Sequence, residues 1–382
     1  MYNMDTMPLR KGHIWILIIA SAGQFFGGVL AILVGVIAPL ITITHHPELS
    51  SWLQGFIFSA GLIGIMLGSL LFGRLSDKYG YLFFFRLSPL LIVGSSLWLC
   101  FNPSLVTLPI NLLIIGLAIG GDYALDPSYV SEIMPQKWRR TMLGISKASS
   151  GVGNILMILV AWFVLKNSAD PAIWNRLFLF LTFFAALAFS GRLWFVESPE
   201  WLALHGKVQE AEKNIKHFLG KDVYIGELAN KKDQTTRPQA SAKDLFARGN
   251  IKRILLSGIP WGCEGMGVYG IGIFTPILLL TLGLVPSGEN PFDKVVESFR
   301  FTLYINLFVM LGFLLGLTVV RRISIIHTQS TGFFICAAGL IITLLGYLYH
   351  ASLGITLGGF LLFELALNAG PHLSTFELPS RI

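Results

Sequence analysis

Two long apolar segments of this chain are joined by a short charged turn, Gly73-Arg74-Leu75-Ser76-Asp77-Lys78-Tyr79-Gly80. Each segment, residues 52–72 and 81–101, is long enough to cross a bilayer, which takes about 20 residues. Because the turn is short, the two helices it joins must be antiparallel neighbours. Its two glycines allow a tight turn and a close approach of the backbones. The pattern therefore predicts a transmembrane helix pair joined at one membrane face.

The composition supports the same class of protein. Hydrophobic residues make up 54% of the 382 residues and charged residues only 13%, and the mean hydropathy is +0.68. A soluble domain carries about 25% charged residues. Because lipid offers the backbone no hydrogen-bond partners, we expect an all-α membrane protein. The net charge of +7 does not indicate a nucleic-acid partner, since the cations lie in loops between apolar segments.

The apolar segments predict ten membrane spans. They lie near residues 14–44, 52–73, 82–101, 107–133, 141–165, 173–195, 253–284, 299–320, 329–349 and 352–375. Cations gather in alternate loops, at Arg10-Lys11, Arg74 and Lys78, Lys137 to Arg140, and Arg321-Arg322. This asymmetry predicts a cytoplasmic N-terminus in a plasma or inner membrane. We expect a six-helix bundle over residues 1–196, a polar cytoplasmic loop over 197–252 and a four-helix bundle over 253–382.

Further motifs follow the turn in order. Span four carries Gly120-Gly121-Asp122-Tyr123 and is followed by Glu132, Pro135 and Arg139; span six is followed by Glu197-Ser198-Pro199-Glu200-Trp201-Leu202. Together with the G-x-L-x-D-x-x-G turn, these resemble the major facilitator superfamily of transporters, and within it the sugar-porter branch with its E-x-x-P-x-x-x-R and P-E-S-P-R-W-L signatures. The Gly-Gly-Asp-Tyr core is similar to that of the phosphate–proton symporters of the same group.

The resemblance implies two pseudo-repeated helical bundles, with about ten helices present of an expected twelve. A weak internal repeat agrees, because Ser131 to Pro135 after span four corresponds to Phe376 to Pro379 after span ten. On this interpretation the chain is shortened at its C-terminal end. The implied function is secondary active transport of a small polar solute by alternating access, coupled to protons, in a monomer. The implied gating network at the cytoplasmic face consists of Gly73, Asp77, Gly80, Glu132, Arg139, Arg140, Arg192 and Glu197.

Several carboxylates fall inside the predicted spans. Asp122 lies about half-way along span four, and Asp126 shares its helix face one turn later. Glu264 and Glu364 lie within spans seven and ten. A carboxylate in the bilayer interior costs at least about 2 kcal/mol, so such groups usually face a wet path. The candidates for binding substrate or protons are Asp122, Tyr123, Asp126, Gln24, Trp261, Glu264, Tyr269, Glu364 and Asn368, with Asp122 first.

The charge inside the spans also indicates a kind of substrate. Lys147, Arg86 and Arg192 are expected near the cytoplasmic ends of their spans, which leaves the predicted cavity net acidic. Such a cavity favours a neutral or cationic solute over an anion, because an anion needs a cation or several amide donors. Spans five and seven lack the glutamines with which sugar porters bind hydroxyls, which weakens the case for a hexose.

Other classes of protein remain as alternatives. The chain could be a non-transporting remnant, a receptor that binds solute without moving it, or a structure in which Asp or Glu only links helices. We expect no enzyme, because no nucleophile and base share a depth in the spans. We also expect no metal and no cofactor, since Cys100, Cys263 and Cys336 are spread over separate apolar segments. The expected partners are a small-molecule substrate, protons and the lipid bilayer.

Overall fold

The computed structural model describes residues 2–45, 50–168, 170–220, 223–224, 248–285, 290–319 and 322–378. The middle of the predicted cytoplasmic loop lies outside this part of the chain. Arg321, which belongs to one predicted cation pair, and the final residues 379–382 also lie outside it.

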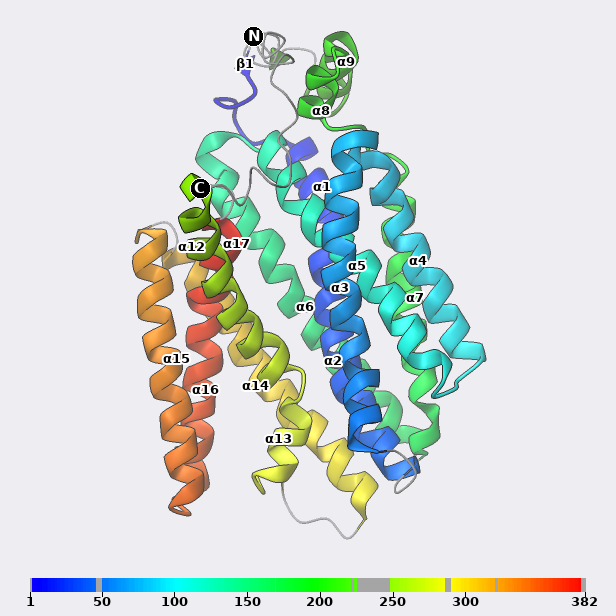
Figure 1. Cartoon of the computed structure of the whole chain (residues 1–382), viewed down its shortest axis with the longest axis vertical. Helices are drawn as coiled ribbons and strands as arrows, with labels where there is room; N and C mark the ends of the chain where they lie inside the picture. Colours follow the sequence, from blue (N-terminus) through cyan, green and yellow to red (C-terminus); the bar gives the residue numbers. More distant parts are fainter. Residues whose placement is uncertain are drawn as a thin grey trace.

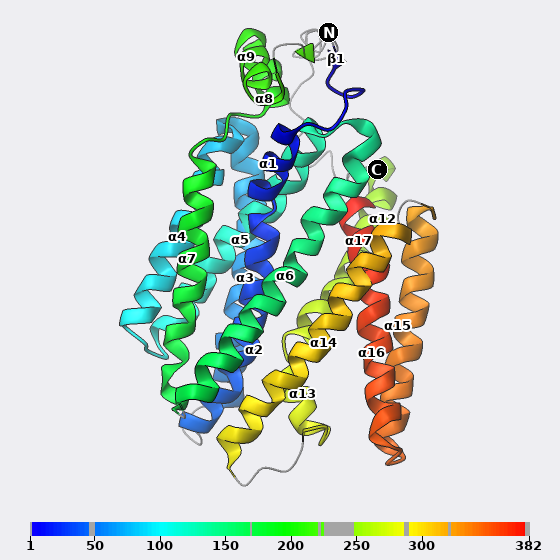
Figure 2. The ribbon, with the colours of Figure 1, turned by 180° about the vertical axis from the view of Figure 1, so that it is seen from behind.

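Long helices dominate the described residues (Figures 1 and 2). Nine helical segments are long and apolar enough to cross a membrane, and a bent pair, Gly249–Gly272 with Thr275–Thr281, makes a tenth. The predicted all-α membrane fold is therefore confirmed. The first six spans are built from α1 (Lys11–Ala20), α2 (Ala22–His45), α3 (Ser51–Tyr79), α4 (Tyr81–Phe101), α5 (Thr107–Ile133), α6 (Gln136–Ser168), the 3-10 helix η1 (Pro171–Leu177) and α7 (Phe178–Arg192).

The second half of the chain contributes fewer spans. Its helices are α12 (Arg248–Gly265), η3 (Met266–Gly272), α13 (Thr275–Thr281), α14 (Pro291–Val319), α15 (Ile325–Leu348), α16 (Leu353–Ala369) and α17 (Pro371–Glu377). In both views α14 runs obliquely beside α6, so these two helices join the halves along much of their length (Figures 1 and 2).

Small residues set how closely helices approach inside the first half. The helix α3 crosses α5 at Gly68 and Gly120, which face the partner backbone. A Cβ added at Gly120 would lie 2.0 Å from the carbonyl oxygen of Ile65, and one added at Gly68 would lie 1.9 Å from that of Leu117. Any side chain here would push the helices apart, as is usual where membrane helices pack through small residues.

Three predicted spans are interrupted. Span one breaks at Ser21, whose backbone N–H and hydroxyl both donate to the carbonyl oxygen of Leu17. Span seven passes through the π-helical η3 and bends by 60° before α13. Span ten breaks at Gly370, between α16 and α17. Continuous hydropathy did not reveal these breaks, and all three lie in helices that wall the cavities described below.

The segment after span six forms a cap on one end of the molecule. It contains α8 (Pro199–Leu204) and α9 (Val208–Leu219), which lie beside the N-terminus (Figure 1). A two-residue parallel pair, β1 (Tyr2–Asn3) with β2 (Val223–Tyr224), is the exception to the helical fold. The guanidinium of Arg10 donates to the carbonyl oxygen of Leu219, which holds the end of α9 against the start of α1.

Candidate functional site

Among the described residues, two polar cavities are lined by both the first and the second half of the chain. The central cavity measures about 410 Å³ and is lined from one side by Gln24, Ile65, Ser69, Tyr123, Ala124 and Lys147, and from the other by Trp261, Glu264, Tyr269 and Phe376. A smaller cavity of about 50 Å³ shares Tyr123, Lys147 and Tyr269 with it. The smaller cavity extends along α6, α14, α16 and the start of α17, where Asn154, Asn306, Glu364, Asn368 and His372 line it.

Most of the residues predicted to bind substrate or protons lie on these walls. They are Gln24, Tyr123, Trp261, Glu264, Tyr269, Glu364 and Asn368. The structure thus brings together side chains that are up to 344 positions apart in the sequence, from Gln24 to Asn368. Asp122 and Asp126 line neither cavity, and their position is described separately below.

Two tyrosines meet across the junction of the halves. The hydroxyl of Tyr269 donates to the hydroxyl of Tyr123 over 3.3 Å. Gly27 lies directly against the ring of Tyr123. A Cβ added at Gly27 would lie 1.8 Å from the Tyr123 hydroxyl oxygen, so the contact requires glycine. The side-chain amides of Asn154 and Asn306, on α6 and α14, lie 3.0 Å apart. These polar contacts lie beside apolar ones, such as that of Phe313 on α14 with Gly151 on α6.

The cavity contains a cation that the sequence analysis placed elsewhere. Lys147 was expected near the cytoplasmic end of span five, but α6 begins eleven residues earlier, at Gln136, which puts Lys147 about three helical turns inside. It is only 5% exposed, and its ammonium lies 5.3 Å from the ring centres of both Tyr123 and Phe376. The expectation that no cation reaches the cavity was therefore wrong.

His372 was not singled out from the sequence at all. Its Nδ1 lies 3.3 Å from Oε1 of Glu264, and both side chains are buried. The contact joins α17 to α12 at the wall of the central cavity. A signal was present in the sequence: Gly370-Pro371 interrupts an apolar span immediately before this histidine, and such breaks turn polar side chains inward.

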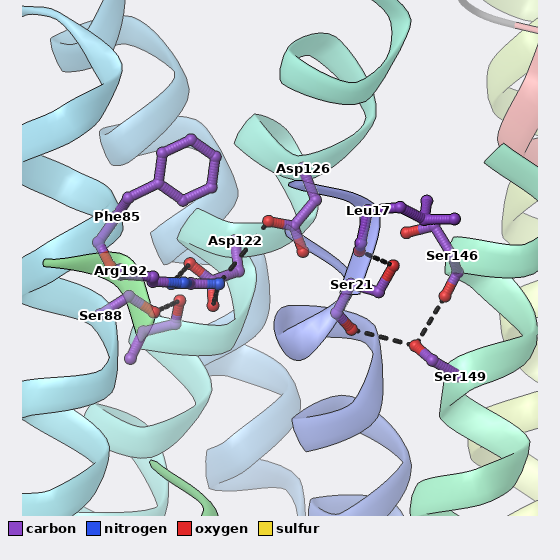
Figure 3. A network of polar contacts seen from close by, with 10 residues as sticks. Leu17, Ser21, Phe85, Ser88, Asp122, Asp126, Ser146, Ser149 and Arg192 are labelled. Atoms are coloured by element: carbon purple, nitrogen blue, oxygen red, sulfur yellow. Dashed lines mark hydrogen bonds and ion pairs between the residues drawn. The ribbon is translucent and has the colours of Figure 1, made fainter. Parts of the chain in front are cut away.

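The two aspartates on α5 belong to a buried charge cluster with Arg192 (Figure 3). The guanidinium of Arg192 donates to both oxygens of Asp122, over 2.8 and 2.9 Å, and to the carbonyl oxygen of Phe85 over 2.9 Å. Asp126 lies farther away, at 3.7 Å from the same guanidinium, and neither of its oxygens accepts a hydrogen bond from the described residues. All three charged side chains are fully buried.

This arrangement corrects the expected place of Arg192. The resemblance implied a gating role at the cytoplasmic face, whereas the structure pairs Arg192 with Asp122 inside the first half. The backbone of α2 presses on the cluster, since a Cβ at Gly23 would lie 2.2 Å from Cβ of Asp122 and 2.5 Å from Oδ2 of Asp126. The next residue, Gln24, lines the central cavity, so α2 contacts both sites at once.

The other predicted gating residues gather at the capped end. Glu197 accepts from the backbone N–H groups of Tyr81 and Leu82, over 2.8 and 3.2 Å, and so caps the N-terminus of α4. Gly80 has φ of 91° and faces that carboxylate, which favours glycine. Glu132 accepts a hydrogen bond from the hydroxyl of Ser198.

Two other residues of the turn, Asp77 and Gly73, contact α8 and α5 respectively. The indole N–H of Trp201 donates to the backbone oxygen of Asp77 over 3.0 Å. Gly73 lies in α3 opposite Ala124, close enough that an added Cβ would touch the alanine Cβ at 3.6 Å. These contacts all lie within the first half and α8, so they stabilise one bundle and do not join the two.

An ion pair between described residues joins the halves at this end. Nε of Arg140 lies 2.7 Å from Oε2 of Glu377, and the guanidinium also donates to the carbonyl oxygen of Ile323. Arg139 instead pairs with Asp5, over 2.8 Å, within the first half. Glu377 was not among the predicted gating residues, although the internal repeat had placed it at the position equivalent to Glu132.

The fold and the cavity between two helical halves define a class of protein, the membrane transporters of the major facilitator superfamily. The structure superposes on a partially occluded, inward-open xylose transporter XylE from Escherichia coli with a TM-score of 0.78, over 98% of this chain and 86% of that one, at 18% identity. Residues 9–372 match the family described as "Sugar (and other) transporter". The chain belongs to this family, which confirms the prediction of a multi-pass transport protein rather than an enzyme.

Two relatives of this family are moderately similar to the chain in sequence. The chain is 26% identical over 344 residues to the inner membrane metabolite transport protein YgcS of Escherichia coli K12, covering 89% of this chain and 72% of that one. It is 30% identical over 278 residues to the D-xylose transporter of Levilactobacillus brevis, covering 68% of this chain and 57% of that one. The chain thus spans between about half and three quarters of the length of these relatives.

Proposed function

We propose that this chain moves a small polar solute across a cell membrane by alternating access, coupled to protons. The observation that carries the proposal is the central cavity, whose walls come from both halves while an inter-bundle ion pair, Arg140 with Glu377, lies at the capped end. A rocking of two bundles about a midplane site is how such folds expose the site to each side in turn. We place the N-terminus and the cap in the cytoplasm.

The buried charge cluster supplies the argument for protons. Two carboxylates and one guanidinium carry a net charge of −1 when all are ionised, and a net charge buried in this way is costly. Asp122 has a two-pronged contact with Arg192, which stabilises its ionised form. Asp126 has no hydrogen bond from the described residues, so we assign the exchangeable proton to Asp126.

Coupling between proton and solute would pass along α2. Gly23 touches both carboxylates of the cluster, and its neighbour Gln24 lines the central cavity. The break at Ser21 is tied to α6, because the hydroxyl of Ser149 donates to the carbonyl oxygen of Ser21 over 3.0 Å (Figure 3). A change in the charge of Asp126 therefore acts on α2 close to its boundary with α1 at Ser21.

Distance measurements between spin labels test alternating access without knowledge of the substrate. After replacement of the three cysteines, labels are placed in pairs on α6 and α15, at Gln136 with Ile326 at the capped end and at Asn167 with Tyr349 at the opposite end; all four side chains are exposed. In Glu377→Ala the first distance should lengthen and the second shorten. Unchanged distributions at both ends would contradict the proposal and favour a static binding protein.

A further inference from the structure

Lys147 is a buried cation with no carboxylate within ion-pair distance among the described residues. Its side chain lines both cavities, yet its ammonium forms no ion pair and no hydrogen bond with the residues that the structure describes. Two aromatic rings, of Tyr123 and Phe376, flank it instead. Charged groups inside membrane spans almost always pair with an opposite charge or mark the path of a substrate. The missing partner of Lys147 points to an anion in the cavity.

The carboxylate of the cavity wall, that of Glu264, belongs to the other half of the chain. Glu264 contacts His372 over 3.3 Å, and both belong to the second half of the chain, whereas Lys147 belongs to the first. A solute anion bound to Lys147 would therefore place a negative charge in contact with this ammonium. This differs from the expectation of a neutral or cationic solute, which depended on the absence of a cation in the cavity.

The remaining wall limits the kind of anion. The central cavity offers one ammonium, which shares the cavity with the carboxylate of Glu264, and a phosphate dianion carries more negative charge than one ammonium balances. A single negative charge suits one ammonium. Gln24 and Ser69 add one amide and one hydroxyl to the lining, and the aromatic rings of Tyr123, Trp261, Tyr269 and Phe376 come from both halves. Flat rings of this kind stack on a flat or apolar body.

We propose that the central cavity binds a small organic monocarboxylate with an aromatic body, whose carboxylate is held by Lys147. The inference rests on the proposed function in one respect, namely that this cavity is the transport site. A volume of about 410 Å³ lies within the usual range for small-molecule sites and accommodates a single substituted ring.

Binding of benzoate to the purified full chain in lipid nanodiscs tests the proposal. Benzamide has the same shape without the charge, and D-xylose serves as a neutral polar solute. We expect benzoate to bind at least about 30-fold more tightly than benzamide, because loss of one partner of a buried charge pair usually costs that much or more. Lys147→Met should weaken benzoate binding by a similar factor, while Lys147→Arg should retain most of it.

A matched control is Lys166→Met. Lys166 is on the same helix and also lies over an aromatic ring, that of Trp162, at 4.9 Å, but it lies outside both cavities. This variant should bind benzoate as the natural chain does. Equal affinity for benzamide and benzoate, absence of benzoate binding, or unchanged binding in Lys147→Met would each overturn the proposal. Thermal unfolding of Lys147→Met shows whether a loss of binding comes from misfolding. If it does, benzoate binding to Lys147→Arg is the test: retained binding supports the proposal and lost binding overturns it.

Exchange in vesicles separates this inference from the proposed function. If labelled D-xylose exchanges across reconstituted vesicles while benzoate does not bind, transport stands and the anion site is wrong. If benzoate binds through Lys147 but the spin-label distances never change, the anion site stands and alternating access is wrong.

Discussion

The buried charge cluster and the central cavity each contain a buried cation, but among the described residues only the cation of the cluster has carboxylates within ion-pair distance. Arg192 is fully buried and contacts Asp122 through two hydrogen bonds, with Asp126 within 3.7 Å. Lys147 is nearly as buried and has aromatic rings in place of acids. A cation with its partners built in stabilises the fold, whereas one without them is available to a ligand. Substitutions at the two sites should therefore behave differently.

Removal of Arg192 should have the largest effect on stability. In Arg192→Met, Asp122 and Asp126 remain buried without a counter-ion, and breaking a buried ion pair from one side costs about 3–5 kcal/mol. We expect a large fall in the unfolding midpoint in detergent, followed by circular dichroism. Adding Asp122→Asn to Arg192→Met should recover part of the loss, because one unpaired charge is removed. A normal unfolding midpoint in Arg192→Met would show that the cluster does not stabilise the fold.

The two aspartates of the cluster should differ from each other. Asp126→Asn removes no hydrogen bond, so its cost in unfolding free energy should stay below about 1 kcal/mol, while Asp122→Asn disrupts the two-pronged pair with Arg192 and should cost about 2–4 kcal/mol. In vesicles, Asp126→Asn should exchange solute normally but lose accumulation driven by a proton gradient. Normal accumulation in Asp126→Asn would remove this residue from the coupling mechanism.

The contrast also shows what the sequence could and could not predict. Hydropathy located the spans, because each long apolar segment must satisfy its backbone as a helix in lipid. It could not locate the breaks at Ser21 and Gly370, which keep the apolar character of their spans. Most cavity-lining candidates were found as polar or aromatic residues at span centres. The depth of Lys147 was missed because α6 starts earlier than its apolar part.

The pairings between side chains on distant helices could not be predicted from the sequence. Asp122 and Arg192 are 70 residues apart, and nothing in either span specifies that the long side chain at the end of α7 reaches the middle of α5. Asp122 was therefore interpreted as a group of the central cavity. The spacing of Asp122 and Asp126 was informative all the same, since a separation of four residues places both on the helix face that Arg192 contacts.

Substitution in the ion pair at the capped end should have a smaller effect than substitution in the buried cluster, because this ion pair is partly exposed. The side chain of Arg140 is 23% exposed, and such a pair contributes up to about 1 kcal/mol, which corresponds to about a fivefold shift between closed and open states. In Arg140→Ala, a single cysteine at Ser69 in the cavity wall should react several-fold faster with an impermeant thiol reagent added at the capped end. Arg139→Ala is the control, since Arg139 pairs only within the first half. Equal rates in the two variants would argue against a latch.

Removal of the cavity cation should have the smallest effect on stability, and this is the sharpest test of the comparison. Lys147→Met replaces a buried ammonium that has no acidic partner among the described residues with an apolar chain of similar length. Since the substitution breaks no ion pair at contact distance among the described residues, the unfolding free energy should change by less than about 1 kcal/mol, and in the stabilising direction. Thermal unfolding measured without solute checks this. A loss as large as that in Arg192→Met would mean that Lys147 is paired within the protein, and the two buried cations would then have the same structural role.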